Sequence, residues 1–133
     1  MAKHTRSELR LVQPSFKQYQ RKGQLAVNFL LRKKIGEVPK AIYNKNVGWI
    51  DLVWGYEGTE NSDGFGLSKI YKYHKEVVSK LSNIIKSLPV KRRSKNRIIL
   101  ENNQYRVVIA MATFEGENMW LLSAFYLTQK KKS

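Results

Sequence analysis

Residues at three- and four-residue spacing form a stripe along residues 67–88, and this is the clearest helical pattern in the chain. The stripe comprises Leu67, Ile70, Tyr71, His74, Val77, Val78, Leu81, Ile84, Ile85 and Leu88. Pro89 follows it, and proline cannot continue a helix. The pattern predicts one helix over residues 67–88 with His74 on its buried side.

A second helical pattern covers residues 16–34, interrupted or capped at Gly23, and residues 24–34 form its stronger half. Gly36 is placed to end this helix. Residues 1–14 are charged and lack a clear period, which indicates an arm or a short first helix.

The remaining apolar segments are typical of strands. Strands are expected at residues 37–43, 49–54, 97–101, 105–114 and 119–128, and residues 90–93 form a short basic strand or a linker. Short turns between the last three strands predict an antiparallel meander, and the first two strands should pair as a hairpin. Helices packed on one face of an antiparallel sheet make an α+β domain, whose other face or rim is free for a substrate.

The length of 133 residues suits one domain, residues 1–133, in which residues 1–22 are a possible basic arm or linker and residues 129–133 a frayed tail. No apolar run approaches the roughly 20 residues that span a bilayer, so we expect no membrane insertion. A monomer is the default expectation.

The charge is strongly unbalanced, with 25 Lys and Arg residues against 10 Asp and Glu residues and a formal net charge of +15. Such an excess attracts polyanions, so nucleic acid is the expected partner, and a generic basic surface or an acidic protein partner is the alternative. The chain has no cysteine, which excludes disulfides, thiolate nucleophiles and Cys-based zinc sites.

The acidic residues are scattered without ligand spacing, and His4 and His74 lie far apart, so neither a two-metal centre nor a zinc site is expected, and no cofactor. The remaining chemistry is metal-free RNA cleavage. The 2′-hydroxyl attacks the adjacent phosphorus, a base and an acid move protons, and cations hold the phosphoryl charge. Histidine, with an ordinary pKa near 6.5, suits the proton steps.

His74 is the best candidate proton carrier, although a hydrogen-bonded core histidine would also lie on this stripe. Lys69, near the start of the same helix, either binds phosphate or is a solvated lysine. His4 lies in the N-terminal arm and is the weaker alternative.

Further candidates lie on the later strands. Arg97 begins a strand after a basic run that is either a phosphate track or a solvated loop. Ser123 alternates with Leu121 and Phe125, so we expect it to share their face, as a site residue or as a satisfied buried serine. The candidate substrate-binding residues are Tyr73, Arg92, Arg93, Lys95 and Asn96. The three tryptophans could stack on bases, but core packing is the preferred interpretation.

Five segments together resemble the phage-type barnase–EndoU–colicin–RelE-like nucleases. They are GEV at residues 36–38, GWIDLVWG at 48–55, GFGLSKI at 64–70 followed by His74, SKNRI at 94–98 and WLLSAF at 120–125. The similarity runs from about residue 23 to residue 125, and the GWIDLVWG block is its most specific part.

The resemblance implies helices packed on a curved antiparallel sheet and ribonuclease activity without metal. It also implies a toxin module that cuts RNA, with tRNA the expected substrate, and that is restrained by an acidic immunity protein. Such a module acts in the cytoplasm of a target bacterium and is delivered at the end of a larger secreted or phage-associated protein. The implied catalytic residues are Lys69, His74, Arg97 and Ser123. Some relatives have His in place of Lys69 and Thr in place of Ser123.

Two other functional classes remain open at this point. A non-catalytic RNA- or DNA-binding module would explain the charge but gives His74 no role. A metal-dependent DNase is disfavoured by the scattered acidic residues.

Overall fold

The computed structural model describes residues 14–58, 64–111 and 119–127. The helical elements are η1 (Lys17–Tyr19), α2 (Gln24–Lys33), α3 (Leu67–Tyr73), η2 (Lys75–Lys80) and α4 (Leu81–Ser87), of which η1 and η2 are 3₁₀ helices. The strands are β1 (Glu37–Asn44), β2 (Gly48–Val53), β3 (Val90–Arg93), β4 (Arg97–Glu101), β5 (Tyr105–Met111) and β6 (Met119–Tyr126).

The strands of the described residues form one six-stranded sheet in the order β1-β2-β6-β5-β4-β3. The predicted β1–β2 hairpin and the β4–β5–β6 meander are confirmed, and β3 pairs with β4 at the edge. β2 and β6 pair in parallel, through Asp51 and Trp120, which the sequence did not predict. The sheet is therefore mixed but mostly antiparallel, and the predicted α+β class is confirmed.

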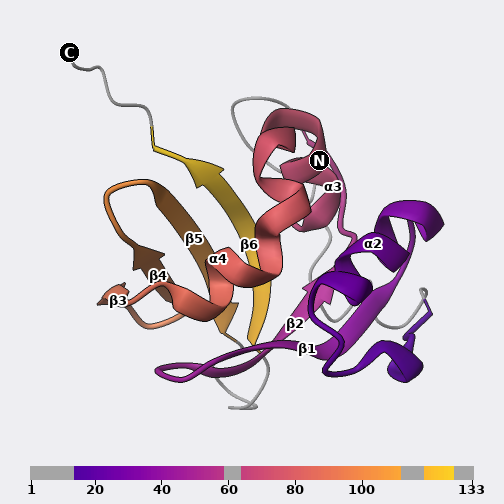
Figure 1. The fold of residues 1–133 in the computed structure, drawn as a ribbon, viewed down its shortest axis with the longest axis horizontal. Helices are drawn as coiled ribbons and strands as arrows, with labels where there is room; N and C mark the ends of the chain where they lie inside the picture. The colour runs from indigo at the N-terminus through magenta and orange to yellow at the C-terminus, as the bar shows by residue number, and fades with distance from the viewer. Residues whose placement is uncertain (1–13, 59–63, 112–118, 128–133) are drawn as a thin grey trace.

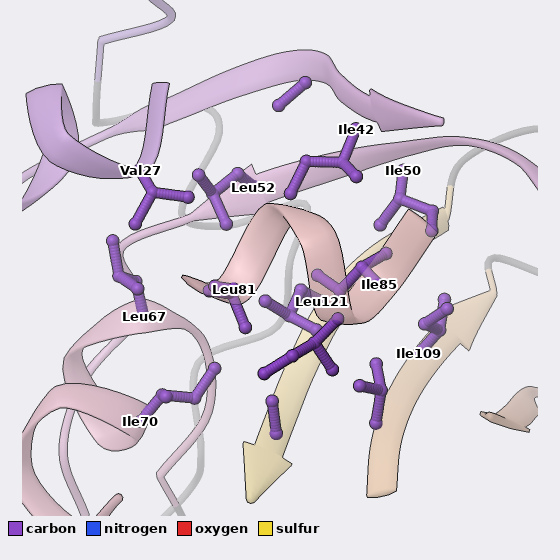
Figure 2. Packing of buried hydrophobic residues seen from close by; sticks show 14 of the residues in the cluster. Val27, Ile42, Ile50, Leu52, Leu67, Ile70, Leu81, Ile85, Ile109 and Leu121 are labelled. Atoms are coloured by element: carbon purple, nitrogen blue, oxygen red, sulfur yellow. The ribbon is translucent and has the colours of Figure 1, made fainter. Parts of the chain in front are cut away.

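Helices α2 and α4 cover one face of the sheet, and α3 lies beside β6 (Figure 1). The core forms between them because each element contributes an apolar side (Figure 2). Val27 of α2, Ile85 of α4 and Leu121 of β6 are fully buried in this cluster. Leu67 and Ile70 of α3 belong to the same cluster, and α3 packs against β6 at the position of the candidate site.

The single helix predicted over residues 67–88 is wrong, because the chain leaves helical geometry at His74, whose φ is −141°. The three- and four-residue spacing holds on both sides of the break, since Ile70 and Val77 are both fully buried. The break lets α3 pack along β6 while α4 packs against β1. His74 therefore ends α3 instead of lying in the middle of a helix.

Asp51, a carboxylate within an apolar strand, accepts a hydrogen bond from the backbone N–H of Lys40 at 2.9 Å. The register of β1 shifts between Val38 and Ile42, and Lys40 there has a φ of +48°. The bulge turns the Lys40 N–H away from the regular ladder and towards the carboxylate. This contact gives buried Asp51 a structural role in the hairpin.

Residues 14–22 run along the edge of β1. The Phe16 N–H donates to the Glu37 carbonyl oxygen at 2.8 Å, and the Tyr19 ring stacks on Phe29 with centroids 4.2 Å apart. The rest of the predicted arm (residues 1–13, including His4) and the predicted tail (residues 129–133) lie outside the described residues. No helix among the described residues has the length and apolar content needed to cross a bilayer.

Candidate active site

The site begins where β6 separates from β2. Within the described residues, β2 pairs with β6 only through the Asp51–Trp120 bridge. Beyond this bridge, the Gly66 N–H donates to the Leu122 carbonyl oxygen at 2.8 Å, so the segment before α3 takes the place of β2 beside β6. Gly66 has a φ of +83°, and a Cβ there would lie 2.8 Å from the carbonyl oxygens of Val53 and Trp54. This glycine therefore allows α3 to start against β6.

His74, at the end of α3, lies against Phe125 of β6. The ring centroids are 5.2 Å apart and the ring planes are tilted by 40°. The His74 N–H donates to the Ile70 carbonyl oxygen at 2.7 Å, which ties the residue to α3. His74 is half-buried, so it is partly shielded from water.

Burial is the main reason that the pKa of His74 lies below its ordinary value of 6.5. The charge of Lys69 lowers this pKa further, and the charge of Glu76 opposes the shift. His74 is therefore neutral at pH 7 and able to accept a proton. Since Lys69 acts on His74 electrostatically, two of the predicted site residues lie within range of each other.

Ser123 lies on the same sheet face as Phe125, but not on that of Leu121, so this part of the prediction is wrong. The reason is a bulge in β6: Leu121 pairs with Ile109 and Ser123 with Val108, which leaves Leu122 as an extra residue. The bulge places Leu121 in the core and turns Ser123 to the opposite face. Ser123 is 9% exposed.

We call the face opposite α2 and α4 the outer face. By strand alternation it carries Arg92, Arg97, Ile99, Glu101, Arg106, Val108, Ala110, Trp120, Ser123 and Phe125. Three arginines against one glutamate make this set of residues positively charged. Arg106 is the Cα partner of Phe125, so it is the outer-face cation nearest to the His74 contact along the strand pairing.

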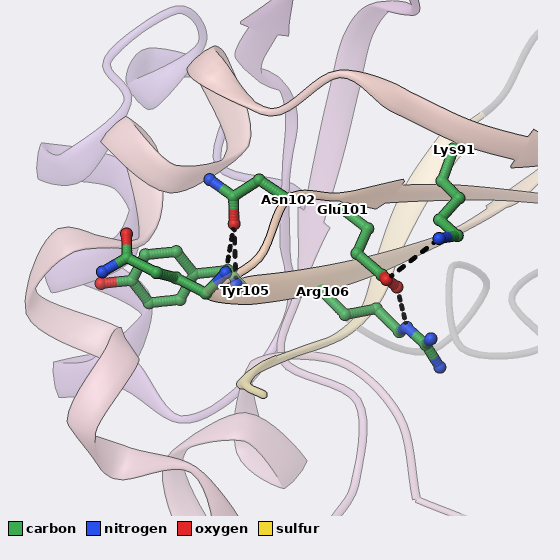
Figure 3. A network of polar contacts seen from close by, with 6 residues as sticks. Lys91, Glu101, Asn102, Tyr105 and Arg106 are labelled. Carbon is green, nitrogen blue, oxygen red and sulfur yellow. Dashed lines mark hydrogen bonds and ion pairs between the residues drawn. The ribbon is translucent and has the colours of Figure 1, made fainter. Parts of the chain in front are cut away.

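Arg106 belongs to an ion-pair network that joins β5 to β4 and β3 (Figure 3). Its Nε donates to Glu101 Oε1, and Lys91 Nζ lies 3.5 Å from Glu101 Oε2. The hydrogen bond from Arg106 is the main reason that the pKa of Glu101 lies below its ordinary value of 4.5. Arg106 and Glu101 were not among the predicted site residues. The available signal was an arginine within the apolar strand YRVVIAM, where a half-buried cation needs a partner.

Arg97 lies on the outer face but far from His74. It pairs with Ala110, which pairs with Trp120, whereas Phe125 lies at the other end of β6. Arg97 lies two strands away from Phe125 and about four residues farther along the strand direction. Together these displacements put their Cα atoms roughly 17 Å apart. The structure therefore does not bring Arg97 next to His74.

The predicted substrate-binding residues lie on both faces of the sheet, in the turn before β4 and on α3. Arg92 pairs with Ile99 on the outer face, whereas Arg93 points to the helix side and donates to the Asn46 carbonyl oxygen at 2.9 Å. Lys95 and Asn96 are exposed in the turn before β4. Tyr73 is half-buried at the end of α3, beside Lys72.

The tryptophans also differ from one another. Trp54 packs against the core as predicted, whereas Trp49 lies beside Tyr43, with ring centroids 5.2 Å apart, and beneath the Arg21 guanidinium. Trp120 is half-buried on the outer face. No three His, Asp or Glu side chains of the described residues gather as a group that could hold a metal ion.

Comparison with known proteins identifies the family of this chain. Residues 41–131 match the family model described as phage-Barnase-EndoU-ColicinE5/D-RelE like nuclease1. Comparisons with curated proteins and with solved structures gave no match. The matched region holds the broken helix, the outer face and every predicted catalytic residue. The chain belongs to this family of phage nucleases.

Proposed function

We propose that this nuclease domain is an endoribonuclease that cleaves RNA without a metal ion and uses His74 as its proton carrier. The observation that carries the proposal is the contact of the His74 ring with Phe125, at the rim of a cationic sheet face. A half-buried imidazole with a pKa below 6.5 is neutral at pH 7, as a general base must be.

In the proposed reaction, His74 accepts the proton of the ribose 2′-hydroxyl. The 2′-oxygen then bonds to phosphorus, the bond from phosphorus to the 5′-oxygen breaks, and that oxygen takes up a proton from water. His74 later releases its proton to the solvent. The products are a 2′,3′-cyclic phosphate and a free 5′-hydroxyl. A general base of this kind contributes about 10²–10⁴-fold to the rate.

Cations of the site hold the charge that develops on the phosphoryl oxygens. Lys69, within electrostatic range of His74, takes this role together with an arginine of the outer face. The family resemblance implies Arg97 for this role. We propose Arg106 instead, because it is the Cα partner of Phe125, and we propose that Arg97 binds a phosphate farther along the RNA. Ser123 orients the phosphate or the 2′-hydroxyl from the same face.

The biological proposal is a toxin that cuts tRNA inside a target bacterium and is delivered as part of a larger protein. It is supported by membership of a phage nuclease family and by the formal net charge of +15. An immunity protein for this toxin would be acidic, because opposite charge accelerates association with so basic a surface.

Incubation with total bacterial RNA in EDTA tests the proposal. We expect discrete new RNA ends that carry 2′,3′-cyclic phosphates. RNA that is retarded on a gel but remains intact would instead indicate a binding module, and cleavage that appears only with added magnesium would contradict the metal-free reaction. Binding data alone cannot separate these cases, since each predicts strong salt dependence.

A further inference from the structure

A hollow of about 390 Å³ lies at the edge of β1, away from His74. Its walls come from the start of α2, from η2 and α4, from the segment before α2 and from the β1–β2 hairpin. The volume falls within the usual range for a small-ligand site. The hollow is not used in the reaction proposed above.

The charged residues that line the hollow are all basic. Arg21, Lys22 and Lys86 line it, each exposed, and none of the described residues around it is acidic. The Arg21 guanidinium lies 5.8 Å from the centre of the Trp49 ring. Three cations without a neighbouring carboxylate form a place for phosphate groups.

An exposed aromatic ring stands beside these cations. Tyr43 is 48% exposed, and its ring is tilted by 58° to that of Trp49, so the pair is not closed by parallel stacking. Nucleobases stack on such rings whatever their sequence. Cations next to an exposed aromatic ring are the kind of groups that recognise a nucleotide.

The walls of the hollow are fixed before any ligand arrives. Gln24 of α2 accepts a hydrogen bond from the Ser82 N–H at 3.1 Å and donates to the Val78 carbonyl oxygen at 2.9 Å. A Cβ on Gly23 would lie 2.8 Å from Ser82 Oγ, so glycine allows the backbone to come close to α4. A preformed site loses little conformational entropy on binding.

The hollow lies at the edge of β1 and is lined from both sides of the sheet, with α2 and α4 on one side and the Tyr43–Trp49 pair on the other. Tyr43 and Trp49 are Cα partners, and their neighbours Ile42 and Ile50 point into the core, so both rings lie on the outer side. Trp49 precedes Asp51 by two residues, and Asp51 pairs with Trp120. Strand geometry puts the hollow on the order of 25 Å from Phe125.

We infer that the hollow binds a nucleotide of the RNA substrate that lies several positions away from the cleaved bond. This inference rests on the proposed ribonuclease function. Arg21, Lys22 and Lys86 contact phosphates, and the Tyr43 ring stacks on a base. The hollow adds affinity for long RNA and leaves the chemical step unchanged.

Binding of labelled oligouridylates tests this inference in the full chain carrying His74→Gln, so that RNA stays intact. Tyr43→Ala or Lys86→Glu should weaken binding of an oligomer of about 15 nucleotides by about tenfold and leave one of about four nucleotides unaffected. Tyr43→Phe keeps the ring, and Lys33→Glu makes the same charge change on an exposed residue outside the hollow. Both controls should stay within about twofold of the parent.

Equal loss with Lys33→Glu and Lys86→Glu, or unchanged binding after Tyr43→Ala, would overturn the inference and leave the hollow to another ligand such as an acidic protein. Cleavage of total RNA by the chain with His74 intact is measured separately. A chain that binds long RNA through Tyr43 but cuts none would contradict the proposed function while supporting the hollow as an RNA site.

Discussion

The His74 imidazole and the Phe125 ring lie in contact at the edge of β6, with centroids 5.2 Å apart. The pair joins the end of α3 to the outer face of the sheet. Phe125 thus both positions the imidazole and shields it from water, and burial is the main cause of the lowered pKa of His74.

Replacing Phe125 with Ala should raise the pKa of His74 towards 6.5, because the imidazole gains water. Cleavage should slow by about tenfold or more, since a loosened base is misplaced. Phe125→Leu keeps an apolar side chain over the imidazole, so it should change the pKa of His74 and the cleavage rate less than Phe125→Ala does. NMR titration of the imidazole and single-turnover rates measure the two effects. An unmoved pKa after Phe125→Ala would show that this ring does not shield His74.

Two charge substitutions should move the pKa of His74 in opposite directions. Lys69→Gln removes a charge that lowers it, so the pKa should rise, whereas Glu76→Gln removes a charge that raises it, so the pKa should fall. A base must be neutral, so cleavage declines as pH falls through this pKa, below 6.5. The acid limb of the pH–rate profile should move with each NMR titration curve. Shifts of the same sign would contradict the electrostatic account.

Two of the three outer-face arginines, Arg106 and Arg97, should differ in their effects. Arg106 pairs with Phe125, and Arg97 lies roughly 17 Å away from it along the sheet. Arg106→Gln should therefore lower kcat, and Arg97→Gln should mainly raise KM through a lost phosphate contact. The reverse pattern, a fall in kcat with Arg97→Gln alone, would place the reacting phosphate near the start of β4.

Gly66 should tolerate alanine poorly. Its φ of +83° is unfavourable for alanine, and a Cβ would meet two carbonyl oxygens at 2.8 Å. Gly48→Ala is the matched control, because Gly48 has a φ of +107° but a Cβ there would only touch Met119 at 3.7 Å. Gly66→Ala should cost more than about 2 kcal/mol of unfolding free energy and Gly48→Ala about 1 kcal/mol. Equal costs in urea unfolding would show that the close contact at Gly66 relaxes.

Much of the fold could be predicted from local pattern. The strand at 97–101 and the helix starting at residue 24 lie where their apolar spacing and turn residues place them. The parallel pairing of β2 with β6 could not be predicted, because it joins strands far apart in the sequence through a single bridge. The break at His74 has no glycine or proline to mark it, and the apolar spacing continues through it.

The candidate site was harder to predict than the fold. His74 and Lys69 could be singled out because residue type and helical position suffice to mark them. The orientation of Ser123 depends on one extra residue in β6, which alternation alone does not reveal. The proximity of Arg106 to Phe125 is set by strand register, and register is a property of the pairing between strands.

The central claim is that His74 moves the proton in metal-free RNA cleavage, and single-turnover cleavage in EDTA tests it most directly. His74→Gln should slow the reaction by about 10²–10⁴-fold, with the folded state checked by thermal unfolding. His4→Gln, which removes the second of the two histidines in the chain, should cleave at the rate of the unmodified protein. A folded His74→Gln variant that cleaves as fast as the His4→Gln variant would contradict the account.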